Sequence, residues 1–280
     1  MNAPSGLAQV SAYVPDAADG SVTEVYGGDL YGNVWRWDFR SDTDPVPAPL
    51  LFATLRDGAG NVQPVTSGPI VRAAPLTRNR YVFVGTGRLL GQSDLYNTST
   101  QSFYAFRDGT RVKAWTATDK PPAVSFPIER SEMVAQTNLL TPVVRNASRP
   151  AGWFYDLANV GERVIVDPVD TDLGKISWLG SIPDSTNPCA PAGGARIYAA
   201  NFETGQSQLF DPTTIGTTNP VRITAYNPQT GIVGLRLVRV DDNIRAVVTG
   251  QYGELKLTQA YVRYLNPRSM NWREVTDAGM

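Results

Sequence analysis

The sequence has no histidine, and its 280 residues include a single cysteine, Cys189. Histidine is the commonest general base and transition-metal ligand in proteins, so its absence excludes a Ser-His-Asp triad or a Cys-His pair. One cysteine cannot form a disulfide within the chain or supply a zinc site. Cys189 stands in a Pro/Gly loop without a basic neighbour. We interpret it as inert, or as a contact to another part of a longer protein.

Neither sign of charge is in excess, since there are 25 basic and 26 acidic residues. Modules that bind nucleic acid usually show a clear basic excess, so no nucleic-acid partner is expected. No apolar run approaches the roughly 20 residues of a membrane-spanning helix, and no basic segment with an apolar core opens the chain. We therefore expect a chain that does not itself span a membrane, from a longer parent that carries a signal peptide.

Glycine and proline are plentiful, with 25 and 21 residues, and they follow no fixed period. This composition is typical of many short strands joined by turns. Helical patterns are scarce, and only residues 128–140 are compatible with one short helix. Successive strands without helical spacers indicate an all-β fold, either a sandwich or a radial arrangement of sheets.

A recurring order of segments favours the radial arrangement. An extended segment with proline, a strand ending in glycine, a strand with aromatic residues and a Gly turn follow one another several times. The spacing of roughly 45 to 60 residues is typical of β-propeller blades with loop insertions. Closed rings have about four to eight blades, so four copies indicate either a small or open propeller or the C-terminal part of a larger one whose other blades lie upstream, and we favour the second. The clearest copy includes the strands at 81–85 and 102–106; a third combines 141–144, 153–155 and 163–166, and a fourth combines 196–205 and 247–250.

We expect two parts, a lead-in over residues 1–15 and a propeller portion over residues 16–280. The stretch from Asp16 to Asp38 opens the second part with an acidic loop, a strand, a Gly-Asn turn and another strand. Alternation with period two places Trp35, Trp37 and Phe39 on one face of that last strand. We expect both tryptophans to be buried in the core.

The acidic loop has two interpretations. Calcium takes about six to eight oxygen ligands, which loops supply from alternate positions. Counted from Asp16 as the first position, Glu24 stands at the ninth and the carbonyl of Val22 at the seventh, whereas Ala18 stands where a side-chain ligand is usual. The alternative is an Asx-type turn before a strand. The candidate metal ligands are Asp16, Asp19, Gly20, Val22 and Glu24.

Several motifs, taken in order, resemble the C-terminal β-propeller domain of the PilY/PilC family, whose members are associated with the tip of the type IV pilus. The first is Tyr26–Leu30 behind the acidic loop, followed by Gly32-Asn33 and Val34–Arg36. Each motif is weak by itself, but their common order makes the set specific. The others are 81–88, 100–105, 152–157, 161–164, 167–169, 182–183, 187–189, 193–194 and 271–274.

The resemblance implies a non-enzymatic module for pilus biogenesis and tip adhesion. Its partners would be the minor pilins of the pilus tip complex and a host or abiotic surface, and its functions would be pilus assembly, attachment and twitching. Its location would be extracellular at the pilus tip, or in the periplasm and at the outer membrane. It also implies Ca²⁺ in the loop before the Tyr-Gly-Gly-Asp strand, where Ala18 and Gly20 depart from the family pattern.

Three other functions stay open at this stage. One is a carbohydrate- or protein-binding propeller unrelated to pili. Another is a hydrolase with two carboxylates, for which Asp167 with Asp170 and Asp241 with Asp242 are candidate pairs, although such residues commonly serve turns. The repeat pattern also resembles quinoprotein dehydrogenase propellers, but a single cysteine excludes the disulfide usual at their quinone.

Overall fold

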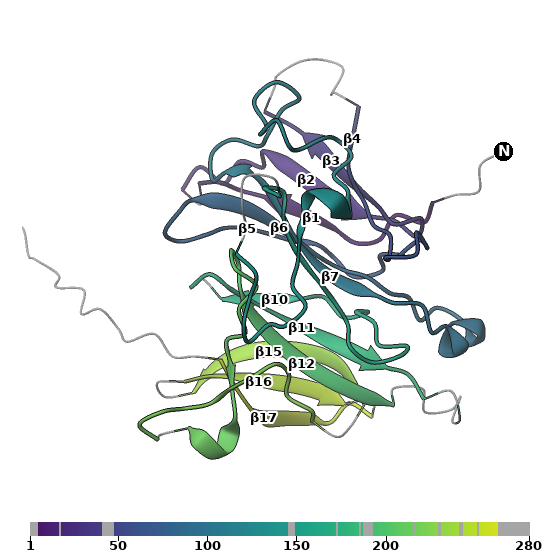
Figure 1. Cartoon of the computed structure of the whole chain (residues 1–280), viewed down its shortest axis with the longest axis vertical. Coiled ribbons are helices and arrows are strands. Elements are labelled where there is room, and N and C mark those ends of the chain that lie inside the picture. Colours follow the sequence, from purple (N-terminus) through teal and green to yellow (C-terminus); the bar gives the residue numbers. More distant parts are fainter. Residues whose placement is uncertain are drawn as a thin grey trace, which may run out of the picture.

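The computed structural model describes residues 5–16, 18–40, 48–144, 149–171, 173–184, 186, 193–215, 217–228, 231–240, 243–250 and 252–262. These residues form β-strands and three short 3-10 helices. Figure 1 shows four sheets that follow one another in chain order, from the purple N-terminal sheet to the yellow C-terminal one. The all-β prediction is confirmed, and the sheets are arranged as β-propeller blades. In the described part, no helix has the length and apolar character needed to cross a membrane.

The first sheet is antiparallel throughout, in the order β1-β2-β3-β4. Its first strand lies within the segment 1–15 that we expected to be a lead-in, so the sheet begins earlier than the sequence indicates. The pattern of this strand is weak because only its last residue, Tyr13, is buried. The strands are β1 (Val10–Tyr13), β2 (Glu24–Gly28), β3 (Asn33–Asp38) and β4 (Leu50–Thr54).

Two turns beside this sheet share one sequence pattern and one set of hydrogen bonds. The Oδ1 atom of Asp29 accepts the backbone N–H of Asn33 at 2.9 Å, and its Oδ2 accepts the side-chain amide of Asn33 at 2.9 Å. Asp57 makes the same two contacts with Asn61, at 2.8 and 2.9 Å. The glycine before each asparagine has a positive φ, of 72° and 86°. The local pattern Asp-x-x-Gly-Asn therefore determines both turns.

The second sheet has the order β5-β6-β7-β9-β8, in which only β8 and β9 are parallel. The short helix expected over residues 128–140 is wrong. That segment forms the single turn η2 (Arg130–Glu132) and the strand β8 (Val134–Ala135), which pairs with β9. The other elements are β5 (Ile70–Ala73), β6 (Asn79–Gly85), η1 (Gln92–Tyr96), β7 (Ser102–Thr110) and β9 (Gly152–Asp156).

The third and fourth sheets divide the chain differently from the predicted repeats. Of the predicted third repeat, residues 153–155 belong to β9 of the second sheet. The predicted fourth repeat is divided, since residues 196–201 belong to the third sheet and residues 247–250 to the fourth. The third sheet consists of β10 (Val169–Thr171), β11 (Lys175–Ile182) and β12 (Gly194–Asn201). The fourth has the order β14-β13-β17-β16-β15, with β13 (Leu209–Phe210), η3 (Pro212–Thr214), β14 (Arg222–Ile223), β15 (Ile232–Val240), β16 (Asn243–Gly250) and β17 (Leu255–Val262).

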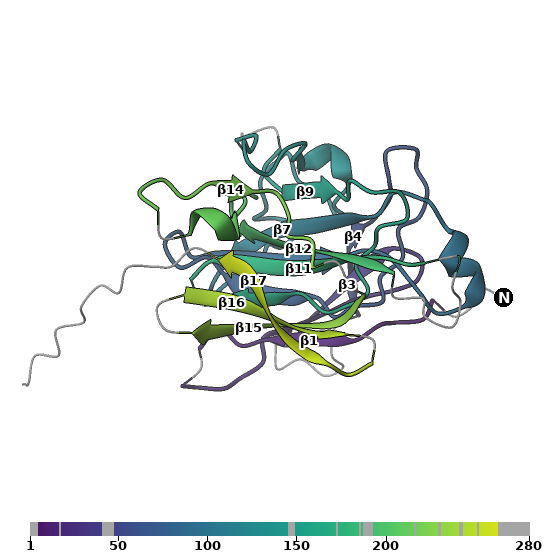
Figure 2. The ribbon, with the colours of Figure 1, turned by 90° about the horizontal axis from the view of Figure 1, so that it is seen from below.

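The strands β1, β5, β10 and β15 are edge strands of their sheets, and successive ones contact one another. The Ser11 hydroxyl donates to the carbonyl of Pro69, just before β5, at 2.5 Å. Arg72 of β5 forms an ion pair with Asp170 of β10 at 2.7 Å. Figure 2, which views the molecule from below, shows β15 and β1 near the same side of the stack. These four strands are therefore the innermost strands of the blades.

Each pair of neighbouring sheets encloses one hydrophobic cluster. The first cluster, with Phe52 and Phe106, joins sheets one and two; the second, with Trp153 and Trp178, joins sheets two and three; the third, with Leu179, joins sheets three and four. A single sheet has two faces and cannot bury both by itself, so each blade depends on its neighbours. This dependence explains why the largest side chains are buried between sheets rather than within one.

Trp35 and Trp37 are only half-buried, which corrects our expectation that both lie in the core. Their neighbour Val34 is fully buried, and Arg36 is 5% exposed, so the opposite face of β3 is the one that packs on the second sheet. Alternate side chains of a strand point to opposite faces. The tryptophan face of the first sheet therefore points away from the core that it shares with the second sheet.

Candidate functional site

The predicted calcium loop connects β1 to β2 and lies on the surface. Asp16, Asp19, Gly20 and Val22 are all exposed. The Oδ1 atom of Asp16 accepts the backbone N–H of Ala18 at 3.0 Å. The backbone carbonyl of Asp16 accepts the N–H of Gly20 at 3.0 Å, where φ is +71°. These contacts form the Asx-type turn that was the alternative interpretation of this loop.

The side chain of Glu24, by contrast, is fully buried at the start of β2. Its Oε2 lies 2.7 Å from Nη1 of Arg80, and its Oε1 contacts Nη2 of Arg40. The hydroxyl of Thr23 donates to Oε2 at 2.5 Å. The guanidinium of Arg80 also lies over the ring of Tyr13, 4.2 Å from its centroid. Two arginines therefore neutralise this carboxylate between the first and second sheets.

The structure does not bring the five predicted calcium ligands together. Four of them belong to an exposed loop, and the carboxylate of the fifth is occupied by arginines. Among the residues that the structure describes, no group of three or more His, Cys, Asp or Glu side chains is placed to hold a metal ion. Calcium binding by these residues stays a prediction.

A second buried ion pair lies beside Glu24. Arg36 of β3 donates from Nη1 to both carboxylate oxygens of Asp108, at 2.7 and 2.8 Å, and from Nη2 to the carbonyl of Trp115 at 2.7 Å. The hydroxyl of Tyr26 donates to the same carboxylate at 2.6 Å. Burial, followed by the negative charge of Asp108, raises the pKa of Tyr26 well above its ordinary value. Both terminal nitrogens of the guanidinium and both carboxylate oxygens are hydrogen-bonded, whereas the buried Nε of Arg36 has no partner among the described residues. These bonds join the two sheets.

A third group of hydrogen-bonded polar side chains, around Arg130 and Tyr104, lies at the outer part of the second sheet. Arg130 binds Asp156 through Nη2 at 2.9 and 2.7 Å, and its guanidinium lies 3.9 Å from the ring centroid of Phe154. The hydroxyl of Tyr104 donates to Oε1 of Gln63 at 2.5 Å. Burial raises the pKa of Tyr104 to about 12. This tyrosine therefore stays protonated near neutral pH.

The motif at residues 161–164 joins the second sheet to the third. Glu162 is 1% exposed and accepts the hydroxyl of Tyr198 at 2.8 Å. Arg163 is buried, and burial lowers the pKa of its guanidinium. Its partners are backbone carbonyls rather than a carboxylate, so it fixes the loop around η1. The carbonyls are those of Arg88 (3.0 Å), Asp94 (2.6 Å), Asn97 (2.7 Å) and Gly161 (2.9 Å).

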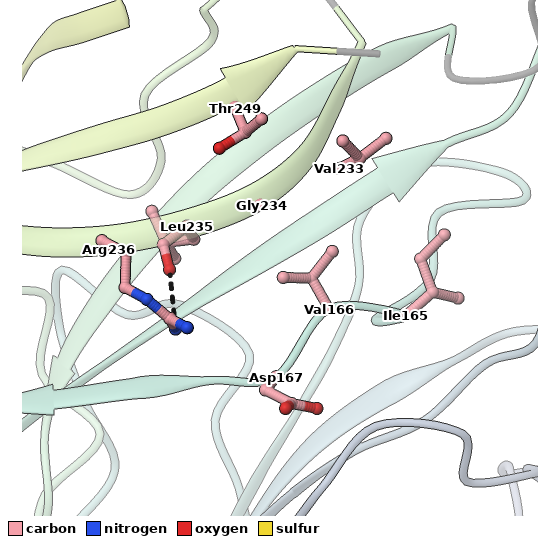
Figure 3. Close-up of a pocket in the computed structure, with 8 residues that line it drawn as sticks. All are labelled: Ile165, Val166, Asp167, Val233, Gly234, Leu235, Arg236 and Thr249. Carbon is pink, nitrogen blue, oxygen red and sulfur yellow. Dashed lines mark hydrogen bonds between the residues drawn. The ribbon is translucent and has the colours of Figure 1, made fainter. Parts of the chain in front are cut away.

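A pocket of about 340 Å³ lies between the segment 165–167 and the strands β15 and β16. Figure 3 shows Asp167 on one wall, and Arg236 and Thr249 on strands of the opposite wall. The Oδ1 atom of Asp167 accepts the N–H of Gly68 at 2.7 Å, so it serves to position the segment before β5. The lining residues include one carboxylate, one guanidinium and one hydroxyl, and this set contains neither a carboxylate pair nor a base beside the hydroxyl.

The candidate catalytic carboxylates of the sequence analysis have separate partners. Asp167 accepts the backbone N–H of Gly68, and Asp170 pairs with Arg72. Asp241, Asp242, Cys189 and the motif at 271–274 lie outside the described residues. Sequence reasoning missed the arginine partners of the buried acids because these residues are far apart along the chain. The only sequence signal was the presence of Arg in apolar, strand-like segments.

No family model matches the sequence. It is similar to "Type IV pilus biogenesis factor PilY1 homolog" of Xylella fastidiosa (strain Temecula1), with 31% identity over 199 residues that cover 67% of this chain and 15% of that protein. It is similar to "Type IV pilus biogenesis factor PilY1" of Pseudomonas aeruginosa (strain PAO1), with 24% identity over 273 residues that cover 81% of this chain and 23% of that protein.

The fold is similar to the crystal structure of the Pseudomonas aeruginosa PilY1 C-terminal domain. The TM-score is 0.65 at 20% sequence identity, and the match covers 90% of this chain and 60% of that one. The chain therefore spans more than half of the solved domain but less than a quarter of the curated relatives that it matches.

Proposed function

Because the chain belongs to the PilY1 family of type IV pilus biogenesis factors, we propose that it serves pilus biogenesis as a binding module without catalytic activity. The observation that carries the proposal is the agreement between sequence and fold. Relatives named for pilus biogenesis match most of the chain, and the PilY1 C-terminal domain has the same fold over 90% of it.

The chemistry of the described residues supports a binding role. The buried acids Glu24 and Asp108 are neutralised by arginines and tie sheets together. The acidic residues beside the 340 Å³ pocket have structural partners as well. A catalytic carboxylate has to be free to exchange protons or attack a substrate, whereas these carboxylates are held by structural partners. Such ion pairs and hydrogen bonds suit a rigid surface for recognition.

The partners that we propose are the minor pilins of the pilus tip complex and a host or abiotic surface. The site of action would be the cell surface at the pilus tip, or the periplasm and outer membrane during assembly. Attachment and twitching would then depend on this module because both require assembled pili. Residues of the exposed loops and of the half-buried tryptophan face are the surfaces on which such contacts can form.

An in-frame deletion tests this proposal in the source organism. Removal of the coding region for residues 5–262 should lower the number of surface pili and reduce twitching and attachment. A matched strain carrying Asp119→Ala, an exposed substitution, should behave like the parent. Normal piliation of the deletion strain would contradict the proposal. Turnover of any substrate in a chromogenic glycoside panel by the purified chain would contradict the non-catalytic part of it.

Calcium binding in the 16–24 loop is a separate proposal with its own test. If Asp16 and Asp19 hold the ion, binding to the folded state raises the melting temperature in millimolar calcium by mass action. The double variant Asp16→Ala/Asp19→Ala should lose this rise and keep its melting temperature in chelator. An unchanged melting temperature of the wild type in calcium would end the proposal, without affecting the pilus role.

A further inference from the structure

A second pocket, of about 640 Å³, lies between the innermost strands of the first two sheets. Its walls are residues 12–15, around the end of β1, and residues 71–75, around the end of β5. Both are edge strands, and among the described residues no backbone hydrogen bond joins them. A pocket of this size accommodates a short peptide segment, and an open strand edge offers backbone partners for it.

Three arginines line this pocket, and none of its lining residues is acidic. Arg72 forms an ion pair with Asp170, and the Nε of Arg111 donates to the carbonyl of Pro15 at 2.8 Å. Arg78 is exposed, and its guanidinium has no hydrogen bond or ion pair with the described residues. The pocket therefore combines a positive rim with the apolar wall formed by the ends of β1 and β5.

The backbone of Arg78 has a φ of 60°, the single positive value at a non-glycine residue in the described chain. Glycine adopts this conformation without strain, whereas side chains other than Asn and Asp are uncommon there. The N–H of Arg78 donates to the carbonyl of Ala74 at 3.0 Å, and its carbonyl accepts the N–H of Arg111 at 2.6 Å. Glycine would make the same contacts, so the turn itself gives no reason for an arginine.

Strained residues concentrate at functional sites, where the side chain has a role outside the local turn. Arg78 and Arg111 line the same pocket, and a guanidinium binds a carboxylate through two parallel hydrogen bonds. Polyanion surfaces usually extend over a strongly basic domain, whereas this chain has a net charge of −1. An occupant that carries a few carboxylates and a backbone suits the pocket better than a polyphosphate.

We propose that this pocket binds an extended acidic segment of a partner protein. Its backbone runs along the free edge of β1 or β5, and one carboxylate pairs with Arg78 and Arg111. The proposal goes beyond the pilus role and does not depend on it, because it concerns the chemistry of the ligand and not the identity of the partner.

Fluorescence anisotropy with the full chain tests the proposal. The probe is a labelled eight-residue peptide of alternating Glu and Val, and the matched control peptide has Gln in place of Glu. The acidic peptide should bind at least tenfold more tightly than the control, and its affinity should fall as salt is raised. Heparin serves as a competitor that distinguishes a general polyanion site from a peptide site.

Two substitutions at one position separate binding from stability. Arg78→Gly and Arg78→Gln should each weaken binding of the acidic peptide about tenfold or more, since each removes the guanidinium. Only Arg78→Gly should raise the melting temperature, because it alone relieves the positive φ. Arg56→Gln, at an exposed arginine outside the pocket, should change neither quantity.

Several results would overturn the inference. Equal binding of the Glu and Gln peptides would show that carboxylates are not recognised. Undiminished binding by both Arg78 variants would remove the pocket from the contact. Tight binding of heparin without measurable binding of the peptide would assign the site to an anionic polysaccharide. A lower melting temperature of Arg78→Gly would contradict the argument from backbone strain. The peptide affinity of Arg78→Gln would then show whether Arg78 contacts the ligand.

Discussion

The interface between the first two sheets and that between the last two differ in chemistry. The former buries two ion pairs, Glu24 with Arg80 and Asp108 with Arg36, among aromatic rings such as that of Phe52. The latter is a cluster of aliphatic side chains, of which Leu179 is fully buried. Hydrophobic burial is non-directional, whereas a hydrogen-bonded charge pair requires one geometry. The first interface therefore depends on the correct pairing of its charged side chains, and the last depends on close packing of its aliphatic side chains.

The largest effect should come from breaking a buried ion pair. Asp108→Ala leaves the guanidinium of Arg36 buried without its counter-charge, and such truncations cost about 3–5 kcal/mol of unfolding free energy. Urea denaturation followed by tryptophan fluorescence measures the loss. The control is Asp119→Ala, which removes an exposed carboxylate near Lys113 and should change little. A loss below about 1 kcal/mol for Asp108→Ala would show that the pair does not support the interface.

The next effect concerns volume at the last interface. Leu179→Ala should lower the free energy of unfolding by about 2–4 kcal/mol, because it removes buried methyl groups and leaves a cavity. The loss should be the same at low and high salt, unlike an effect of surface charge. Leu76→Ala is the matched control, since Leu76 is 93% exposed. An equal loss for both variants would contradict the assignment of Leu179 to the core.

The smallest effect is a dependence on alkaline pH at the first interface. Burial raises the pKa of Tyr104 to about 12, so the unfolded chain releases this proton from about pH 10 while the folded chain retains it. The contribution of Tyr104 to the free energy of unfolding is fully present below about pH 10. It decreases as the pH rises towards 12, by up to about 2 kcal/mol. Tyr104→Phe should remove this part of the decrease, at a cost of about 1 kcal/mol near neutral pH.

Parallel denaturation curves of the wild type and Tyr104→Phe at pH 7 to 11 isolate this residue from the other buried tyrosines. An identical alkaline slope in both proteins would show that Tyr104 titrates with its ordinary pKa in the fold. The last interface contains no such tyrosine in its buried cluster, so Leu179→Ala should leave the alkaline slope of the wild type unchanged.

The comparison also explains which features were predictable from sequence. The strand at Tyr81–Gly85 was predictable because five successive apolar or small residues are followed by a turn, and β6 contains all of them. The strand β1 was not, since its side chains are mostly exposed and its place is set by pairing with β2. Residues 128–140 tolerate a helix locally, but pairing of β8 with β9 outweighs this weak preference.

The candidate site was less predictable than the fold. Glu24 was interpreted as a metal ligand because its spacing from Asp16 is suitable and because carboxylates bind calcium. Its partner Arg40 follows the end of β3 and its partner Arg80 belongs to β6, and no local pattern indicates that they meet Glu24. The positive φ of Arg78 was likewise not predictable, since the residue that adopts it is neither glycine nor asparagine, and the neighbouring Asn79 would have been the expected position.

The paired aspartate turns at Asp29 and Asp57 have a consequence for how such a chain grows. In each, one carboxylate accepts the backbone and side-chain amides of its own corner, so the hydrogen bonds that define the bend are local. A segment with this property can be copied and inserted elsewhere in a gene and still fold its corner on arrival. Gene duplication of such a segment can therefore add a hairpin to the propeller first, and later mutations can change each copy.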